Sequence, residues 1–69
     1  MTNPIVDKYG TKRWFNSKNK LHREDGPAIE YADGEKAWVQ NGRLHREDGP
    51  AIIAPNGHKF WYINGKEVK

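Results

Sequence analysis

Glycine interrupts the apolar pattern of this chain about every eight residues, and each interruption separates two short apolar runs. The glycines stand at 10, 26, 34, 42, 49, 57 and 65. This spacing is too close for a helix of even three turns. Between the glycines, the runs at 37–39, 51–53 and 60–63 are rich in β-branched and aromatic residues. Within one such run Lys36, Trp38 and Gln40 would share one face of a strand, and Ala37 and Val39 the other. The pattern therefore predicts short β-strands.

The polar segments between these runs carry hairpin signals. Asn-Gly occurs at 41–42, 56–57 and 64–65, and Asp-Gly at 33–34. These dipeptides favour type I′ turns, in which both central residues need a positive φ. The two Gly-Pro pairs, at 26–27 and 49–50, are expected to bend or bulge the ladder because proline donates no backbone hydrogen bond. We therefore predict an all-β antiparallel meander of about six short strands, two for each repeated unit.

The pattern repeats every 23 residues. The octapeptide LHREDGPA occupies residues 21–28 and recurs at 44–51, and Trp38 and Trp61 are also 23 positions apart. Trp14 precedes Trp38 by 24 because the segment 16–20 holds one extra residue. A fixed period of this length indicates an array of small supersecondary units. We divide the single domain, residues 1–69, into a partial repeat 9–13, repeat one 14–37, repeat two 38–60 and a partial repeat 61–69.

The unit W-x-x-N-G-(K/R)-x-H-x-x-x-G, followed by Asp-Gly or Asn-Gly and the next tryptophan, resembles the MORN repeat over residues 9–66. The resemblance implies a single-layer antiparallel sheet that twists as hairpins are added, used as an interaction scaffold. The segment H-R-E-D-G-P-A departs from the usual MORN unit and resembles repeats of short bacterial and bacteriophage proteins. This departure counts against the lipid-binding role suggested for some MORN proteins.

Charge is distributed unevenly along the 69 residues. The net charge of +3 divides into +4 over residues 1–20, −3 over 21–58 and +2 over 59–69. Basic ends around an acidic middle do not form a uniform nucleic-acid-binding stripe. The chain has no cysteine and no apolar run of about 18 residues, so we expect neither a disulfide nor a membrane span. We expect a soluble protein of the bacterial host cytoplasm.

The repeated histidines are the candidates for catalysis or metal binding. Equivalent strands of neighbouring units lie about 9.5 Å apart, too far for His22 and His45 to converge on one zinc ion. We instead expect each octapeptide to form a structural polar staple that holds the Gly-Pro bend. Asp25 and Asp48 would accept backbone N–H groups in Asx turns, and Arg23 and Arg46 would pair with carboxylates. Each staple consists of a histidine, an arginine and an aspartate: His22, Arg23 and Asp25 in the first, and His45, Arg46 and Asp48 in the second. We expect no catalytic residue, metal or cofactor.

One tryptophan per unit, at 14, 38 and 61, predicts a row on one sheet face that is either core or a partner surface. Candidate partner-binding residues are the aromatic and basic side chains of this row and its N-terminal flank: Trp14, Phe15, Trp38, Trp61, Tyr62, Lys12 and Arg13. The leading hypothesis is a small non-enzymatic protein-interaction module, encoded by a phage or prophage, that binds and inhibits a host protein. The alternative is a binder of nucleic acid or anionic surfaces through basic residues 12, 13, 18, 20 and 23. The open sheet edges also favour a homodimer.

Overall fold

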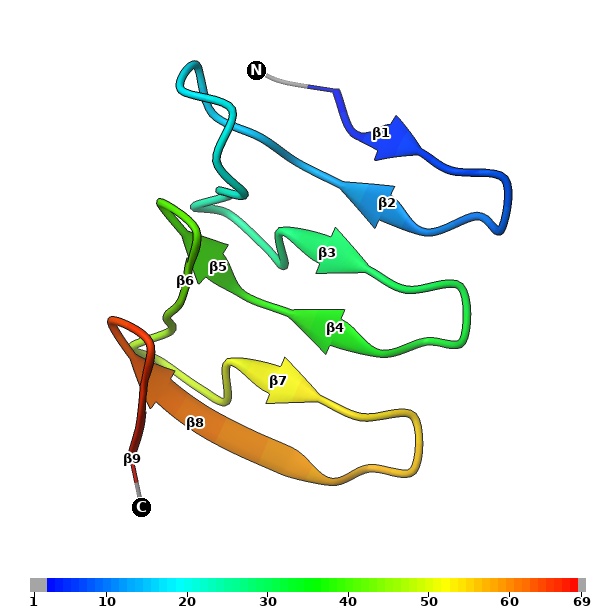
Figure 1. Ribbon diagram of the computed structural model, residues 1–69. Coiled ribbons are helices and arrows are strands. Elements are labelled where there is room, and N and C mark those ends of the chain that lie inside the picture. The colour runs from blue at the N-terminus through cyan, green and yellow to red at the C-terminus, as the bar shows by residue number, and fades with distance from the viewer. Residues whose placement is uncertain (1–2, 69) are drawn as a thin grey trace.

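The structure, a computed structural model, describes residues 3–68 and confirms an all-β antiparallel meander of short strands (Figure 1). The described residues form nine strands and no helix. The strands are β1 (Ile5–Val6), β2 (Lys12–Arg13), β3 (Ile29–Glu30), β4 (Lys36–Ala37), β5 (Val39–Gln40), β6 (Arg43–Leu44), β7 (Ile52–Ile53), β8 (Lys59–Ile63) and β9 (Lys66–Val68).

Seven strands form the main sheet, in the order β1-β2-β3-β4-β7-β8-β9, and β5 and β6 form a separate hairpin. Every pairing is antiparallel. Cα partners join one residue from each strand of the main sheet except β9 into a single row, which runs Ile5, Arg13, Ile29, Ala37, Ile52, Phe60. Ile5 therefore occupies the position that Ile29 and Ile52 hold in the later units. The repeated pattern extends upstream to Ile5, ahead of residue 9, where the sequence signal begins.

Three equivalent turns close the hairpins β1–β2, β3–β4 and β7–β8 at the same side of the sheet (Figure 1). In each turn a glycine N–H bonds to the carbonyl three residues earlier, as Gly34 does to Tyr31 and Gly57 to Ala54, both at 3.0 Å. These two glycines have φ of 97° and 92°, a region that side chains disfavour. The carboxylate of Asp33 accepts the N–H of Glu35 at 3.0 Å and completes an Asx turn.

The remaining hairpins lie at the opposite side of the sheet. Asn41 and Gly42 have φ of 52° and 79°, and Asn64 and Gly65 have φ of 51° and 83°. Both pairs therefore adopt the positive φ values that a type I′ turn requires. At 33–34 and 56–57 only the glycine has a positive φ, so the type I′ geometry predicted for these two turns is wrong. The strand through Trp38 is split, because β4 pairs with β3 and β7 whereas β5 pairs only with β6. This split accounts for one of the additional strands, since the structure contains nine where about six were predicted.

The core is small and lies between the main sheet and the β5–β6 hairpin. Its buried residues are Ala28, Ile29, Ala37 and Val39, and Leu21, Tyr31, Leu44 and Ile52 pack against them. Ala37 and Val39 are buried and Lys36 is exposed, in agreement with the alternation predicted for this segment. The molecule measures 32 × 27 × 16 Å, so it is a slab with limited interior.

Candidate functional site

Each LHREDGPA octapeptide forms a bend between two hairpins; we call residues 21–28 the first bend and residues 44–51 the second bend. The arginine of each bend lies over a tryptophan ring, with Arg23 Cζ 3.9 Å from the ring centre of Trp14 and Arg46 Cζ 3.9 Å from that of Trp38. This distance is well within the range for a cation–π contact. The stack fixes the bend against the strand that precedes it.

The same guanidinium groups hydrogen-bond within the bend. Arg46 Nε donates to Asp48 Oδ1 at 3.2 Å, and its Nη1 donates to the carbonyl of Pro50 at 3.0 Å. The first bend repeats both bonds, from Arg23 to Asp25 and to the carbonyl of Pro27, each at 3.1 Å. The carboxylates of Asp25 and Asp48 thus accept hydrogen bonds from arginine. The prediction of Asx turns at these two aspartates is wrong for the described residues. The guanidinium fork reaches these carboxylates and satisfies them in place of a backbone N–H.

The glycine of each bend leaves room for the guanidinium. A Cβ added at Gly49 would lie 2.9 Å from Arg46 Cζ, and one at Gly26 would lie 3.0 Å from Arg23 Cζ. Neither glycine has a positive φ, so its role is steric and not conformational. The arginine side chain therefore lies between an aromatic ring and the backbone of the glycine.

The histidine of each bend connects one unit to the next. His22 Nδ1 accepts the backbone N–H of Asn41 at 3.0 Å, and His45 Nδ1 accepts that of Asn64 at 3.1 Å. These bonds identify the neutral tautomer with its proton on Nε2, which lies 3.2 Å from a Glu24 oxygen and, in the second bend, 3.4 Å from a Glu47 oxygen. Both ring nitrogens are engaged in structural contacts.

Backbone bonds reinforce this connection between units. Gly42 N–H donates to the carbonyl of Leu21 at 2.8 Å, and Gly65 N–H donates to that of Leu44 at 2.7 Å. The turns at 41–42 and 64–65 are therefore each bonded to the bend of the preceding unit through two hydrogen bonds. The site is an ordered part of the repeat, and it is held by the strands on both sides.

Two grooves lie beside the bends and share one wall. The larger, of about 700 Å³, holds Trp38 and Arg46, and the smaller, of about 540 Å³, holds Trp14 and Arg23. Glu24 and Asp25 line both. The rims carry the glutamate and aspartate of each bend, whose side chains are between 79% and 89% exposed: Glu24, Asp25, Glu47 and Asp48. The grooves thus combine a floor of stacked aromatic and guanidinium groups with an acidic rim. Among residues 3–68, no cluster of three or more His, Cys, Asp or Glu side chains has the arrangement of a metal site.

The three tryptophans differ in exposure along the chain. Trp14 is 8% exposed, Trp38 is half-buried and Trp61 is 47% exposed. Trp14 and Trp38 lie under arginines of the bends, and the part of the chain that the structure describes places no cation over Trp61. The row thus combines both predicted alternatives, since it is covered at its first member and exposed at its last. Phe15 and Tyr62 are half-buried.

The N-terminal basic residues are partly committed to contacts within the chain. Arg13 Nη1 donates to Asp7 Oδ2 at 3.1 Å, whereas Lys12 is exposed. Desolvation raises the pKa of Asp7, but hydrogen bonds from Arg13 and from the N–H groups of Tyr9 and Thr11 outweigh it, so that the pKa lies below its usual value. Arg23 is also bonded within its bend. Of the basic residues predicted to bind anions, at 12, 13, 18, 20 and 23, the exposed ones are therefore Lys12, Lys18 and Lys20.

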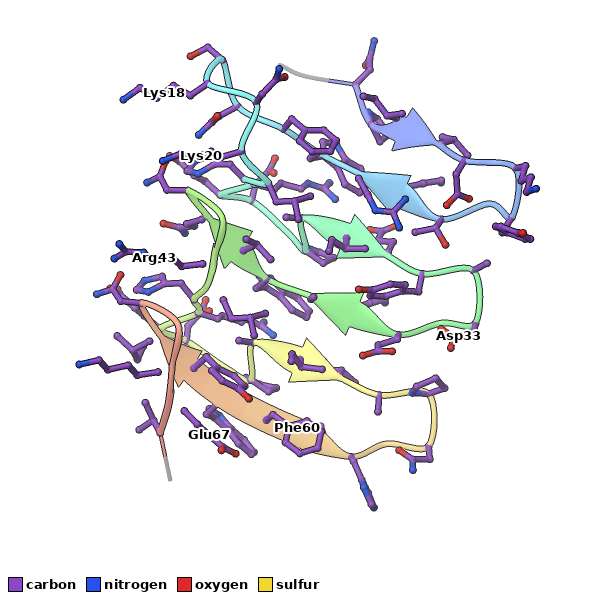
Figure 2. All side chains as sticks on the ribbon, viewed as in Figure 1. Lys18, Lys20, Asp33, Arg43, Phe60 and Glu67 are labelled. Carbon is purple, nitrogen blue, oxygen red and sulfur yellow. The ribbon has the colours of Figure 1, made fainter. Side chains whose placement is uncertain are left out.

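A column of basic side chains crosses the units and was missed by the sequence analysis. Lys20, Arg43 and Lys66 are exposed and spaced 23 residues apart. Consecutive hairpins stack so that a Cβ at Gly42 would lie 4.0 Å from Lys20 Cβ, and one at Gly65 would lie 3.8 Å from Arg43 Cβ. Figure 2 shows Lys18, Lys20 and Arg43 along one margin of the molecule, at the ends of the hairpins. The 23-residue period itself was the signal that could have found this column.

Comparisons with protein-family models, with curated proteins and with solved structures return no match to this chain. The resemblance to the MORN repeat therefore stays a prediction from the sequence. In residues 3–68 there is no helix with the length and apolar character required to cross a bilayer.

Proposed function

We propose that this chain is a non-enzymatic protein-interaction module whose binding face is formed by the two grooves beside the bends. The partner is a protein that presents basic side chains, which would meet the acidic rims while an aliphatic or aromatic portion enters the groove. The single observation that carries the proposal is the repeated groove itself, in which two exposed carboxylates stand over a tryptophan–arginine stack.

The use of the histidines also favours binding over catalysis. Nδ1 of His22 and of His45 accepts a backbone N–H, and Nε2 faces a glutamate of the same bend. A general base or a metal ligand requires a free nitrogen lone pair directed at its target. The more specific prediction is a phage or prophage protein that inhibits a host protein. It rests on the resemblance named above and would give this interaction module its biological setting.

The test is affinity capture from bacterial lysate with the folded protein and two charge-matched variants. Glu47→Gln with Asp48→Asn removes two of the four carboxylates of the larger groove, and Asp33→Asn with Glu67→Gln removes two exposed carboxylates elsewhere. We expect one stoichiometric protein partner, with capture reduced several-fold by the first variant and unchanged by the second. Charged groups at an interface rim act mainly on the association rate and its salt dependence.

Equal capture by both variants, or the recovery of nucleic acid in place of protein, would reject the grooves as the binding face. Circular dichroism of both variants checks that each retains the fold. Neither pair of substitutions removes a buried apolar side chain, so the comparison isolates charge.

The basic column favours a second candidate, the binding of a polyanion such as single-stranded nucleic acid. Lys20, Arg43 and Lys66 lie in hairpins that stack on one another, so their positive charges follow each other from unit to unit. This column is a different surface from the N-terminal segment first predicted, although both contain Lys20.

Binding to a labelled single-stranded oligonucleotide at increasing salt tests this second candidate. Lys20→Gln with Arg43→Gln and Lys66→Gln should weaken binding and reduce its salt dependence, because fewer counterions are released. The matched triple variant Lys8→Gln, Lys12→Gln and Lys36→Gln has the same net charge and should bind as the original protein does. Binding that does not change with salt would exclude this function.

A further inference from the structure

The residues that meet at the junction between consecutive units inside this chain resemble the residues at the two open edges of the sheet. Within the chain, β4 meets β7 with Ala37 opposite Ile52 and Lys36 opposite Ile53. At the ends of the row, β8 presents Phe60 and Lys59 on the side away from β7, just before the stretch 61–63 that pairs with β9, and β1 presents Ile5 and Val6 on the side away from β2. An apolar residue would again face isoleucine, and a lysine would again face a β-branched residue.

The direction of the strands also fits. Every neighbour in the main sheet is antiparallel, and β1 has the direction of β3 and β7, which are the strands that follow a junction. A second copy of β1 placed beside β8 would therefore continue the antiparallel order. The row of Cα partners ends at Ile5 on one edge and at Phe60 on the other.

Burial along this row shows which positions lack a neighbouring strand among residues 3–68. Ile29 and Ala37, in the middle, are buried, whereas Ile5 is 64% exposed and Phe60 is 38% exposed. Val6 and Trp61 are exposed beside them. The β1 edge and the β8 edge thus carry the two sides of the kind of contact that buries the middle of the row. Unpaired strand edges readily pair with another chain.

We propose that two copies of this chain associate head to tail, with β1 of one copy added to β8 of the other so that Ile5 faces Phe60 and Val6 faces Lys59. The internal junction also contains a hydrogen bond from Trp38 N–H to the carbonyl of Ala51, at 2.7 Å. Pro4 holds the place of Ala51 in the first unit and keeps the carbonyl. In a later unit the N–H at this position bonds within its own hairpin, as Ala51 N–H does to the carbonyl of Phe60, and not across the junction. The missing N–H of proline therefore removes no hydrogen bond from the junction.

The contact is heterologous, so each copy keeps one free edge and further copies can add. With two residue pairs in register, the interface belongs to the small and transient class, and association is expected only at high protein concentration. The grooves beside the bends take no part in it. The inference is therefore independent of the proposed function.

Edge-blocked variants test the head-to-tail geometry by complementation. Ile5→Lys with Val6→Lys blocks the β1 edge, and Phe60→Lys blocks the β8 edge, in both cases at exposed side chains. Sedimentation velocity at rising concentration should give an increasing mean mass for the original protein and a monomer for each variant alone. An equimolar mixture should form a dimer and nothing larger, because only one productive pair of edges remains.

Self-association that is abolished by blocking one edge and is not restored in the mixture would show a symmetric contact and overturn the proposal. A protein that stays monomeric up to its solubility limit would overturn it as well.

Disulfide trapping tests the register with conservative changes, since the chain has no cysteine of its own. Ile5→Cys mixed with Phe60→Cys should form the mixed disulfide several-fold faster than Val6→Cys mixed with Phe60→Cys, because directly opposed strand residues bring their Cβ atoms closest. Equal rates for the two mixtures would reject the register.

Discussion

The arginine of each bend has a specific contact on every side of its guanidinium group. For Arg46 these are the ring of Trp38, the carboxylate of Asp48, the carbonyl of Pro50 and the backbone of Gly49. A shorter or bulkier residue at any of these positions would displace the group. This explains why the octapeptide recurs as a unit, since its residues depend on one another.

Gly49→Ala should destabilise the protein by about 1–2 kcal/mol, because the new Cβ displaces the guanidinium and weakens one cation–π contact and two hydrogen bonds. In an Arg46→Ala background the same substitution should cost little, since the space is then empty and alanine restricts the unfolded chain. Urea unfolding of the four proteins in this double-mutant cycle measures the coupling. Additive effects would show that Gly49 acts through its backbone conformation instead.

Asp7 gives the protein a specific acid sensitivity. Its pKa is lowered in the folded state, so its ionised form contributes stability above the unfolded pKa of about 3.9, and this contribution is lost as the pH falls through the folded pKa. Asp7→Asn keeps an acceptor for the N–H groups of Tyr9 and Thr11 but loses the ion pair with Arg13. The variant should melt below the original protein at neutral pH, and the gap should close in acid. A gap that is constant from neutral pH to pH 3 would contradict this assignment.

At the scale of elements, each hairpin is held by the bend of the unit before it. The histidine ring and the leucine carbonyl of a bend receive the two N–H groups of the next Asn-Gly turn. The β5–β6 and β8–β9 hairpins therefore dock through their turns as well as through their side chains.

His45→Ala should destabilise the protein by about 1–2 kcal/mol, or roughly 7–14 °C in melting temperature, because the Asn64 N–H loses its acceptor. His45→Asn should recover part of the loss, since an asparagine oxygen can take the place of Nδ1. His45→Gln should recover less, because its oxygen lies further along the side chain. His58→Ala, at an exposed position of a turn, is the matched control and should change little. Equal losses in all three His45 variants would indicate a packing role for the ring.

The local elements could be predicted from the sequence because turns and alternation are short-range signals. The Asn-Gly hairpins at 41–42 and 64–65 and the buried positions Ala37 and Val39 agree with the prediction. The break at Trp38 was not predictable, because it depends on which distant strand each half of the segment pairs with. The bond between His45 and Asn64 depends likewise on how one unit lies on the next, which no local pattern reports.

At the scale of the whole molecule, the structure is an array whose two ends differ from its middle. The core residues lie in the central strands, and the large exposed apolar side chains lie in the outer ones and in the β1–β2 turn: Ile5, Val6, Tyr9, Phe60, Trp61 and Val68. Stability in such an array comes from contacts between neighbouring units, so a unit with one neighbour is less protected than a unit with two. The basic column, by contrast, has a member in each unit, at Lys20, Arg43 and Lys66, whereas the grooves occur beside Trp14 and Trp38.

This difference between ends and middle predicts the order in which the tryptophans respond to a quencher in solution. Trp61 is 47% exposed, Trp38 is half-buried under Arg46, and Trp14 is 8% exposed under Arg23. Trp61→Phe should therefore remove most of the fluorescence that acrylamide quenches in the folded protein, and Trp14→Phe should remove almost none. In urea the three variants should quench alike, because the unfolded chain exposes every ring. A quenchable fraction that falls equally in all folded variants would mean that the first unit opens as readily as the last. The cation–π stacks would then not protect the rings that they cover.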